Sequence, residues 1–360
     1  MHNAPPHPEL FPEIQLPPAE PKVRAKRGPR QPAQQAASAT LPPEPVAAPP
    51  RADMAQVSVP ADAESMARAL EAHPDYRVQR RLQPRLLWPQ GPSLQTKRLL
   101  VLDTETTGLD PSKDKIIELA LLRVDVDLAT GLPVGPVQVY DGLEDPGMPI
   151  PKEVVGITGI TDADVRGQRL DDARVAQMLD GVDLVVAHNA GFDRPFVEGR
   201  IAQFQHLAWA CSFADIDWKA QGKGSAKLEN LAQGLGLFYD AHRAEMDCHA
   251  LLAVLVTPLP VEQHTGLAHL LETVDKPVYR LQATQAPFDA KDLLKARGYR
   301  WNAEQKVWHT RLGDAQALSE ECAWLKSTVY QQRSAVVQVE KLDARVKYSA
   351  RAGELMRHTL

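Results

Sequence analysis

The sequence predicts an α/β protein built on a mixed five-stranded sheet that is flanked by helices. Three apolar stretches within residues 98–144 are joined by short connections, which is typical of an antiparallel meander. Helical and extended stretches then alternate up to residue 257, the pattern expected where helices cover a sheet. Both kinds of stretch return in residues 276–360 and indicate a separate, small α+β module.

Each strand of the sheet is expected at a short, mostly apolar run. The second run, KIIELALLRVDV, is apolar over most of its length, so we expect it at the centre of the sheet. The expected strands are 98–105, 115–126, 136–144, 183–189 and 207–212.

Four helices are expected among the later strands. The first ends at Gly181, a residue type that often caps the C-terminus of a helix, and the third has Ser225 near its N-terminal cap. The expected helices are 172–181, 190–204, 225–237 and 243–256.

The C-terminal module is expected to combine a small sheet with two helices. A hairpin should turn between Asn302 and Lys306, and the last stretch, 335–349, should form a strand or a hairpin. The remaining elements are a strand at 278–284 and helices at 290–298 and 313–332.

The chain as a whole divides into four segments. Residues 1–60 contain 15 of the 30 prolines, cannot build a core, and are predicted to be a disordered tail. A short helical lead-in follows at 61–96, with a helix from about Glu64 to Ala72 and then a second helical or turn segment. The α/β domain is expected at 97–260 and the basic C-terminal module at 276–360.

The N-terminal tail carries two features that could bind partners. KVRAKRGPRQ is basic and could contact phosphates, although such runs more often serve as a solvated tail. QVSVP at 56–60 faintly resembles peptides that dock on sliding clamps, so a clamp or a DNA polymerase is a candidate partner of the tail.

Cysteine and hydropathy patterns indicate a soluble, cytoplasmic protein. The three cysteines lie far apart, which argues against a disulfide framework or a zinc module and for a reducing compartment. The sequence has no apolar run near the ~20 residues of a membrane span and no basic-then-apolar signal pattern at its N-terminus. We therefore expect no membrane partner.

Charge is distributed unevenly along the chain. Residues 98–275 hold 28 acidic and 14 basic residues, whereas residues 1–97 and 276–360 hold 12 and 15 basic residues against 9 acidic ones each. Basic flanks attract nucleic acid and an acidic domain does not. A metal site in the middle segment would account for part of its acidity, and an ordinary acidic surface is the alternative.

A pair of carboxylates ends the first strand, in LVLDTETTGLDP. Asp103 and Glu105 are two residues apart, so they lie on the same face of the strand and repel each other. Either one of them holds a proton or a cation lies between them. The alternative is a strand end in solvent, where acidic residues are common.

Two further acids lie in unusual settings. Asp193 is in the first turn of a helix directly after a strand, where it could simply favour the helix dipole. Asp247 lies on an apolar helix, and His242 precedes it by five residues. That offset is about 140° around a helix, so we expect His242 on the loop that enters the helix.

These five side chains fit two-metal cleavage of a phosphodiester. The four carboxylates are hard oxygen ligands of the kind that Mg²⁺ binds, and they come from three separate elements. His242 titrates near neutral pH, so it suits a general base that takes a proton from water.

Residues 98–257 resemble the DEDDh (DnaQ-like) 3′–5′ exonucleases, which include the proofreading subunit of the bacterial replicative polymerase and ribonuclease T. The resemblance rests on DTETTGL, HNAGFD and HRAEMD, which match the three family motifs in order. A second subclass has Tyr four residues before the last Asp, and this chain has Arg243 there. The resemblance implies a ribonuclease-H-like fold.

The resemblance also implies roles for individual residues. Asp103, Glu105, Asp193 and Asp247 would hold two divalent metal ions, Mg²⁺ or Mn²⁺, and His242 would act as the general base. The residues that would lie along the 3′-terminal nucleotide are Thr106, Thr107 and Gly108, with Leu109 as a wedge at the terminal base. His188 is expected beside the substrate or, with Phe192, as a brace behind Asp193.

The function expected from these observations is a metal-dependent 3′–5′ exonuclease that removes nucleoside 5′-monophosphates from single-stranded 3′ ends, with DNA favoured over RNA. One alternative is an RNA exonuclease similar to ribonuclease T. The other is a non-catalytic protein that binds nucleic acid or tethers partners on a nuclease fold.

The C-terminal module could contribute to nucleic-acid binding through aromatic and basic side chains. Stacking and phosphate contacts of this kind suit single strands. The alternative is that Trp301 and Trp308 fill the core of the module. The residues concerned are Tyr279, Phe288, Tyr299, Trp301 and Trp308, with Arg297, Arg300, Lys306 and Arg311.

Overall fold

The computed structural model describes residues 62–92 and 95–360 of the chain. The predicted tail 1–60, with its basic run and the QVSVP peptide, lies outside the described residues. The described residues belong to two compact units, which divide between Tyr76 and Arg77. In the described part of the first unit, α1 (Ala63–Glu71) confirms the expected helix, and the Asp62 carboxylate caps it by accepting a hydrogen bond from the Ser65 N–H at 2.7 Å.

After α1 the chain turns and forms short strands, and the alternative of a second helix is wrong. β1 (Arg80–Arg81) pairs with β8 (Leu237–Phe238), and β2 (Leu87–Trp88) pairs with the central sheet. Each pairing involves partners far apart in the sequence, so no local pattern could indicate it.

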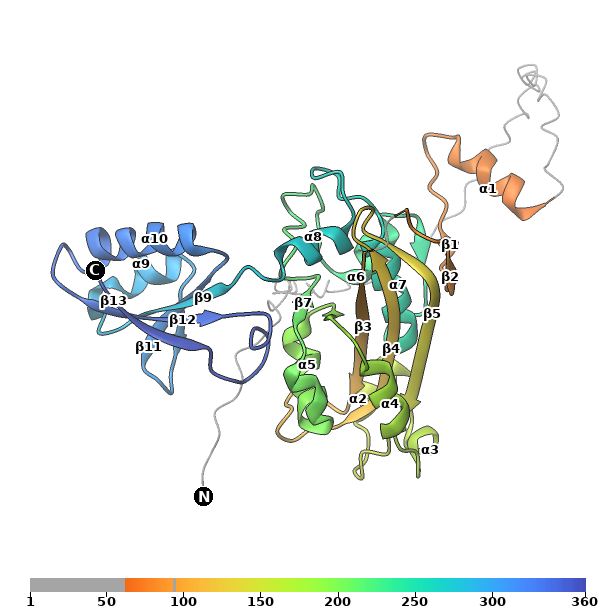
Figure 1. Ribbon diagram of the computed structural model, residues 1–360, viewed down its shortest axis with the longest axis horizontal. Coiled ribbons are helices and arrows are strands. Elements are labelled where there is room, and N and C mark those ends of the chain that lie inside the picture. Colours follow the sequence, from red (N-terminus) through yellow and green to blue (C-terminus); the bar gives the residue numbers. More distant parts are fainter. Residues whose placement is uncertain (1–61, 93–94) are drawn as a thin grey trace, which may run out of the picture. The chain divides into compact units, whose positions relative to one another are not determined.

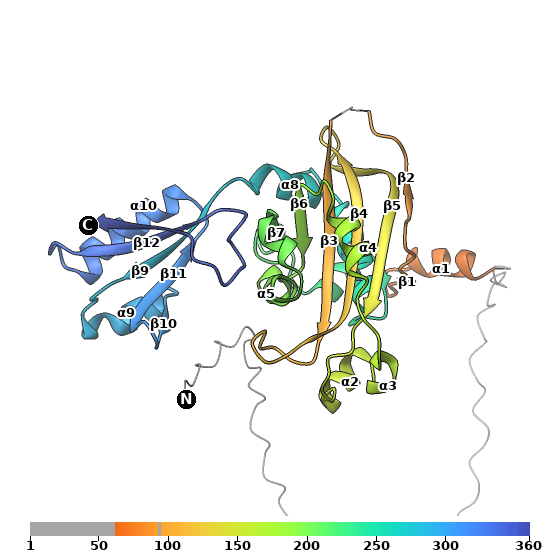
Figure 2. The ribbon, with the colours of Figure 1, turned by 60° about the horizontal axis from the view of Figure 1, so that its bottom comes forward.

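The central sheet contains all five expected strands. Their order, with β2 as a sixth strand at one edge, is β2-β5-β4-β3-β6-β7 (Figures 1 and 2). β3, β4 and β5 form the expected antiparallel meander, while β6 and β7 run parallel to β3, so the sheet is mixed. The strands are β3 (Thr96–Thr106), β4 (Ile116–Asp127), β5 (Leu132–Leu143), β6 (Leu184–Ala187) and β7 (Trp209–Cys211).

Both faces of this sheet are covered by helices (Figures 1 and 2). Leu99 and Val101 face one hydrophobic core, which α6, α7 and α8 complete, and Leu100 and Leu102 face a second core completed by α4 and α5. The helices are α4 (Asp172–Leu179), α5 (Ala190–Arg200), α6 (Leu228–Gln233), α7 (Ala244–Leu255) and α8 (Gly266–Thr273). Burial on both faces explains why β3 and β4 read as nearly continuous apolar runs.

The expected helices are present, but with different lengths. The stretch expected as one helix at 190–204 is α5 followed by a separate 3₁₀ turn (Ala202–His206), because Ile201 between them is extended. α8 and the helices α2 (Lys152–Thr158) and α3 (Asp162–Val165) were not expected; they have only four to eight residues and too few turns for a periodic pattern.

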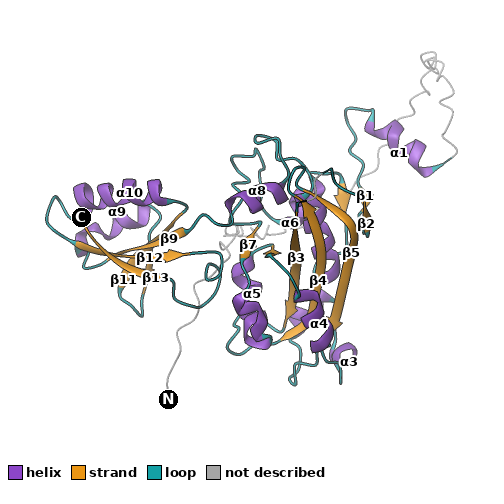
Figure 3. Ribbon diagram, in the orientation of Figure 1, coloured by secondary structure: helices purple, strands orange, loops and turns teal. Residues whose placement is uncertain are grey.

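The C-terminal module is a five-stranded antiparallel sheet with α9 and α10 on one face (Figure 3). The expected hairpin is present, and Lys306 closes its turn with a positive φ of 51°. The last stretch is a hairpin whose second strand, β13, begins later than residue 349. The elements are β9 (Val278–Ala283), α9 (Lys291–Ala296), β10 (Arg300–Asn302), β11 (Val307–Leu312), α10 (Ala315–Trp324), β12 (Val336–Leu342) and β13 (Glu354–Thr359).

The connection between β12 and β13 packs against the α/β domain. The fully buried Arg194 guanidinium donates hydrogen bonds to the backbone carbonyls of Ala344 and Lys347, at 3.3 and 2.6 Å. The Lys347 ammonium lies 3.1 Å from the Asp215 carboxylate and is also buried. These contacts fix the connection against α5 and the end of β7.

Within the described residues, none of the helices is both long and apolar enough to cross a membrane.

Candidate metal centre

Three of the four expected acids come together at the end of β3. Asp103 and Glu105 lie on the same face of β3, and α7 packs across β3 and β4 and brings Asp247 to them. One carboxylate oxygen from each of the three lies within 4.8 Å of the others. The register of β3 and β4 shifts between Glu105 and Thr106, so a bulge lies directly beside the acids.

Asp193 lies beside this group and has a separate anchor. Its Oδ1 accepts hydrogen bonds from the Thr104 N–H at 3.1 Å and the Thr104 hydroxyl at 2.8 Å, and the side chain is buried. Asp193 is outside the set whose oxygens are all within 4.8 Å of one another, yet its charge acts on Asp103. The four acids therefore share one electrostatic environment.

Burial and mutual repulsion raise the pKa values of these acids. Burial and the neighbouring charges of Asp193 and Asp247 raise the pKa of Asp103 well above its ordinary value. Burial, followed by Asp247, raises the pKa of Glu105 to about 8. Burial raises the pKa of Asp193 to about 7 despite the bonds from Thr104. Ionising all the acids together requires a cation between them.

Asp247 is oriented by groups that the motifs do not include. The Tyr239 hydroxyl donates to its Oδ1 at 2.9 Å, and the Arg243 N–H donates to its Oδ2 at 3.2 Å. Burial and the Asp247 charge raise the pKa of Tyr239 above its ordinary value, so the hydroxyl remains a donor. Burial raises the pKa of Asp247, while the bond from Tyr239 and the nearby His242 lower it.

Glu118 anchors the start of α7 beneath the site. It is fully buried on β4, directly opposite Glu105, and its carboxylate accepts hydrogen bonds from the Arg243 guanidinium at 2.8 Å and the Ala244 N–H at 2.9 Å. No local pattern indicated this role, because the pairing of Glu118 with Glu105 and its bonds to α7 form only in the fold.

His242 lies on the loop before α7, as expected. The helix begins at Ala244, and His242 is exposed with a positive φ of 63°. A non-glycine residue seldom adopts this left-handed conformation, which here turns the chain just before the helix. The imidazole is thus placed beside Asp247 and open to solvent.

The expected substrate loop after β3 is held by its own hydrogen bonds. The Thr106 hydroxyl donates to the Gly108 carbonyl at 2.6 Å, and the Thr107 hydroxyl bonds Asp114 at 3.3 Å. A Cβ at Gly108 would lie 2.5 Å from the Asp114 carboxylate, which explains the glycine. Leu109 is 66% exposed and is the member of the loop that points away from the fold.

His188 directly follows β6, which ends at Ala187. Its Nδ1 is 2.8 Å from the Ser212 hydroxyl, and its ring meets the edge of Phe213. Burial lowers the pKa of His188 to about 4, so the ring is neutral near pH 7.

The aromatic residues of the C-terminal module divide into two groups. Tyr299 is buried in the core of the module, and Tyr279 and Trp308 pack against that core. Phe288 and Trp301 are 78% and 50% exposed. The core alternative is therefore confirmed for Trp308 and wrong for Trp301, which is half-exposed; most of Phe288 is exposed as well.

Comparisons with known proteins identify the class of this domain. Residues 100–255 match the family model RNase_T, described as exonuclease. The chain is 29% identical over 188 residues to the DNA polymerase III PolC-type of Thermotoga petrophila, which covers 50% of this chain and 13% of that polymerase. It is also 29% identical over 168 residues to the DNA polymerase III subunit epsilon of Treponema pallidum, covering 43% of this chain and 73% of that subunit.

Two solved structures are also similar. Exonuclease X in complex with 5′ overhanging duplex DNA has 25% identity and a TM-score of 0.34, covering 47% of this chain and 99% of that chain. The zinc-bound E. coli ExoI–ssDNA complex has 17% identity and a TM-score of 0.43, covering 66% of this chain and 68% of that chain. The family match thus shows an exonuclease domain at residues 100–255, and its three motifs are similar to those of the DnaQ-like exonucleases. The chain spans only a small part of the PolC-type polymerases it matches.

Proposed function

We propose that the protein is a metal-dependent 3′–5′ exonuclease that releases nucleoside 5′-monophosphates, with DNA as the favoured substrate. The observation that carries the proposal is the group of Asp103, Glu105 and Asp247, whose oxygens lie within 4.8 Å of one another at the edge of a buried sheet. Their raised pKa values mean that the isolated group is electrostatically unfavourable when ionised, and a divalent cation relieves that repulsion.

The donor set fits Mg²⁺ or Mn²⁺. Asp103, Glu105 and Asp247 would hold the ions with Asp193, and all four offer the hard oxygen atoms that these metals prefer. A bound metal pair activates water and stabilises the attacking and leaving oxygens of an in-line displacement. Thr104, Tyr239 and Glu118 would keep the carboxylates and α7 in position.

His242 is proposed to take the proton from the attacking water. Its exposed ring on the loop before α7 can reach a substrate phosphate from the solvent side, which a residue on the buried face of α7 could not do. Leu109 would pack against the terminal base, because it is the exposed apolar residue beside the acids. His188 is assigned as a neutral brace behind Asp193, with substrate contact as the alternative.

DNA is favoured because the two relatives named above are a DNA polymerase and a DNA polymerase subunit. RNA is the second candidate, and the name of the matching family model favours it. A replicative polymerase or a sliding clamp stays a proposed partner of the N-terminal tail, and the cytoplasm stays the predicted location.

Matched DNA and RNA single strands labelled at the 5′ end test the proposal. With Mg²⁺ we expect a ladder that shortens from the 3′ end, faster on DNA, and no ladder with Asp103→Asn. Glu153→Gln, which changes an exposed acid of α2, should retain full activity. Faster degradation of RNA would reverse the substrate assignment, and binding without cleavage of either strand would favour the non-catalytic alternative.

A further inference from the structure

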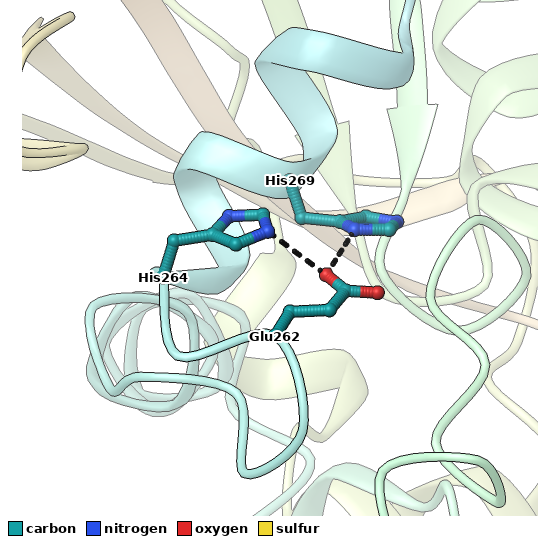
Figure 4. Close-up of side chains that lie close together, drawn as sticks. All are labelled: Glu262, His264 and His269. Carbon is teal, nitrogen blue, oxygen red and sulfur yellow. Dashed lines mark hydrogen bonds and ion pairs between the residues drawn. The ribbon is translucent and has the colours of Figure 1, made fainter.

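A second group of metal-ligating side chains lies outside the acidic centre, beside α8 (Figure 4). Glu262 and His264 come from the loop before α8, and His269 comes from the first turns of that helix. One ligand atom from each residue lies within 4.8 Å of the other two. In Figure 4 both imidazole rings point to the same carboxylate oxygen of Glu262.

The loop that carries Glu262 and His264 is tightly held. The Leu259 N–H donates to the His264 carbonyl at 2.8 Å, and the Gln263 N–H donates to the Leu259 carbonyl at 2.9 Å. Gln263 has a positive φ of 65°, which turns the chain between the two ligands. The side chains on either side of Gln263 are therefore presented together toward His269.

Two of the distances among the three side chains are close to those around a tetrahedral metal. Glu262 Oε2 is 3.1 Å from His264 Nε2 and 2.7 Å from His269 Nδ1. Two ligands that each lie about 2.0 Å from a tetrahedral Zn²⁺ are about 3.3 Å apart. A zinc ion would therefore lengthen the first contact by about 0.2 Å and the second by about 0.6 Å, while the ring nitrogens of His264 and His269 lie within 4.8 Å of each other.

The tautomer of His269 also points to a cation. Its Nε2 is 3.0 Å from the Asp215 carbonyl oxygen, which can only accept, so Nε2 carries the hydrogen. In a neutral ring, Nδ1 then presents a lone pair to Glu262 Oε2, which is also an acceptor. Two acceptors at 2.7 Å need a proton or a metal ion between them.

Partners behind the ligands are of the kind found around metal sites. The Gln221 amide N–H donates to Glu262 Oε1 at 3.2 Å, and its oxygen accepts from the Val261 N–H at 3.0 Å, which fixes the direction of the amide. Glu262 Oε1 is thereby occupied, and Oε2 is left as the ligand. The bond from His269 to the Asp215 carbonyl is the usual outer contact of a ligating histidine.

We propose that Glu262, His264 and His269 bind one Zn²⁺, with water as the fourth ligand. The His264 and Glu262 side chains are each about one-third exposed, so solvent can reach the fourth position. Two imidazoles and one carboxylate favour Zn²⁺ over Mg²⁺, which prefers oxygen ligands alone. The site uses none of the three cysteines, which is why cysteine spacing could not reveal it.

The proposed ion would lie next to the residues that hold the connection between β12 and β13 against the α/β domain. His269 bonds the backbone of Asp215, and the Asp215 side chain bonds Tyr348 and the buried Lys347. Zn²⁺ at this site has a structural role: it stabilises the loop before α8 and the contact of Asp215 with Lys347 and Tyr348. The zinc site is separate from the acidic centre.

Zinc content measured by mass spectrometry tests the proposal on the full-length chain. The variant Asp103→Asn with Glu105→Gln serves as the background, because it disables the acidic centre as a competing metal site. After incubation with Zn²⁺ and gel filtration, we expect one Zn²⁺ per chain in this background. Adding His264→Ala or His269→Ala should remove it, and adding His206→Ala, an exposed histidine elsewhere, should not.

Co²⁺ substitution gives a second measurement. The background protein should show the intense visible absorption of tetrahedral Co²⁺, and Glu262→Gln, which keeps the size of the side chain, should weaken binding at least tenfold. Zn²⁺ should raise the Tm of the background protein and not that of Glu262→Gln. Should a histidine variant fail to fold by circular dichroism, Glu262→Gln decides the question.

Two results would overturn the proposal: no Zn²⁺ retained by the folded background protein, or Zn²⁺ retained unchanged when Glu262 or either histidine is substituted. In either case the Glu262 carboxylate binds an imidazolium at His269 and the cluster is a hydrogen-bonded ion pair.

Discussion

The acidic centre should make the metal-free protein less stable as the pH rises, and Glu105→Gln should remove part of that loss. The ordinary pKa of this carboxyl is 4.5, and the folded protein raises it to about 8. Between these values the native state keeps a proton that the unfolded state has lost. The free energy of unfolding therefore falls with increasing pH in this interval, because the native state binds more protons.

The size of the effect follows from the same two values. Integrating the proton difference from pH 5 to pH 8 gives a loss of about 3.5 kcal/mol from Glu105 alone. Glutamine cannot ionise and keeps the size of the side chain, so the variant should lack this contribution. Mg²⁺ should reverse the loss in the wild-type protein, because a cation favours the ionised acids.

Urea unfolding of both proteins in EDTA, followed by circular dichroism at pH 5 and pH 8, measures this difference. We expect Glu105→Gln to gain about 3.5 kcal/mol relative to the wild type between the two pH values, and the exposed-site control Glu153→Gln to gain nothing. If the free energy of unfolding had the same pH dependence in the wild type and in Glu105→Gln, the interpretation that burial and repulsion raise the pKa of Glu105 would be refuted.

Three further predictions concern the groups around the site. Thr104→Val removes the hydroxyl bond that favours the ionised form of Asp193. Because a bond to a charged group contributes about 1.5–3 kcal/mol, the acidic limb of the pH–activity profile should move up by about one pH unit. An unchanged pH profile would count against this role. His242→Ala should lower kcat by at least about 100-fold and leave Mn²⁺ affinity, measured by calorimetry, unchanged, because general bases contribute about 10²–10⁴-fold; a kcat equal to that of the wild type would exclude the imidazole as the base. Arg194→Met should cost about 3 kcal/mol of stability in urea unfolding, because the buried Glu198 and the carbonyls of Ala344, Arg345 and Lys347 each lose one hydrogen-bond donor. A neutral effect would show that the remaining bonds, from the Trp209 N–H to Ala344 and from Arg351 to Arg345 and Glu198, are enough to hold the connection.

The sequence was most informative where local pattern and fold agree. β3, β4 and the helices that carry Asp193 and Asp247 all follow from long apolar runs or helical stretches, and the motif acids fall at their ends. The alternation of side chains on β3 was enough to place Asp103 and Glu105 together. His242 was placed on a loop because its offset from Asp247 is incompatible with a shared helical face.

The remaining features depend on contacts that no local pattern records. β1 and β2 are two-residue strands that are defined only by their pairing with β8 and β5, which lie far away in the sequence. Six exposed residues form β13, so no alternation of apolar and polar side chains identified it. The sequence did not indicate that Thr104 and Tyr239 bond Asp193 and Asp247, because these contacts form only in the folded chain.

The central claim is that the acids at the end of β3 form a cation-dependent centre for cleavage. Its most direct test is single-turnover cleavage of a 5′-labelled DNA strand by the wild type and by Asp103→Asn, over a series of Mg²⁺ concentrations after removal of metal with EDTA. We predict no cleavage by the wild type until Mg²⁺ is added, and none by Asp103→Asn at any concentration. Cleavage by the wild type in EDTA, or by folded Asp103→Asn at the wild-type rate, would contradict the assignment.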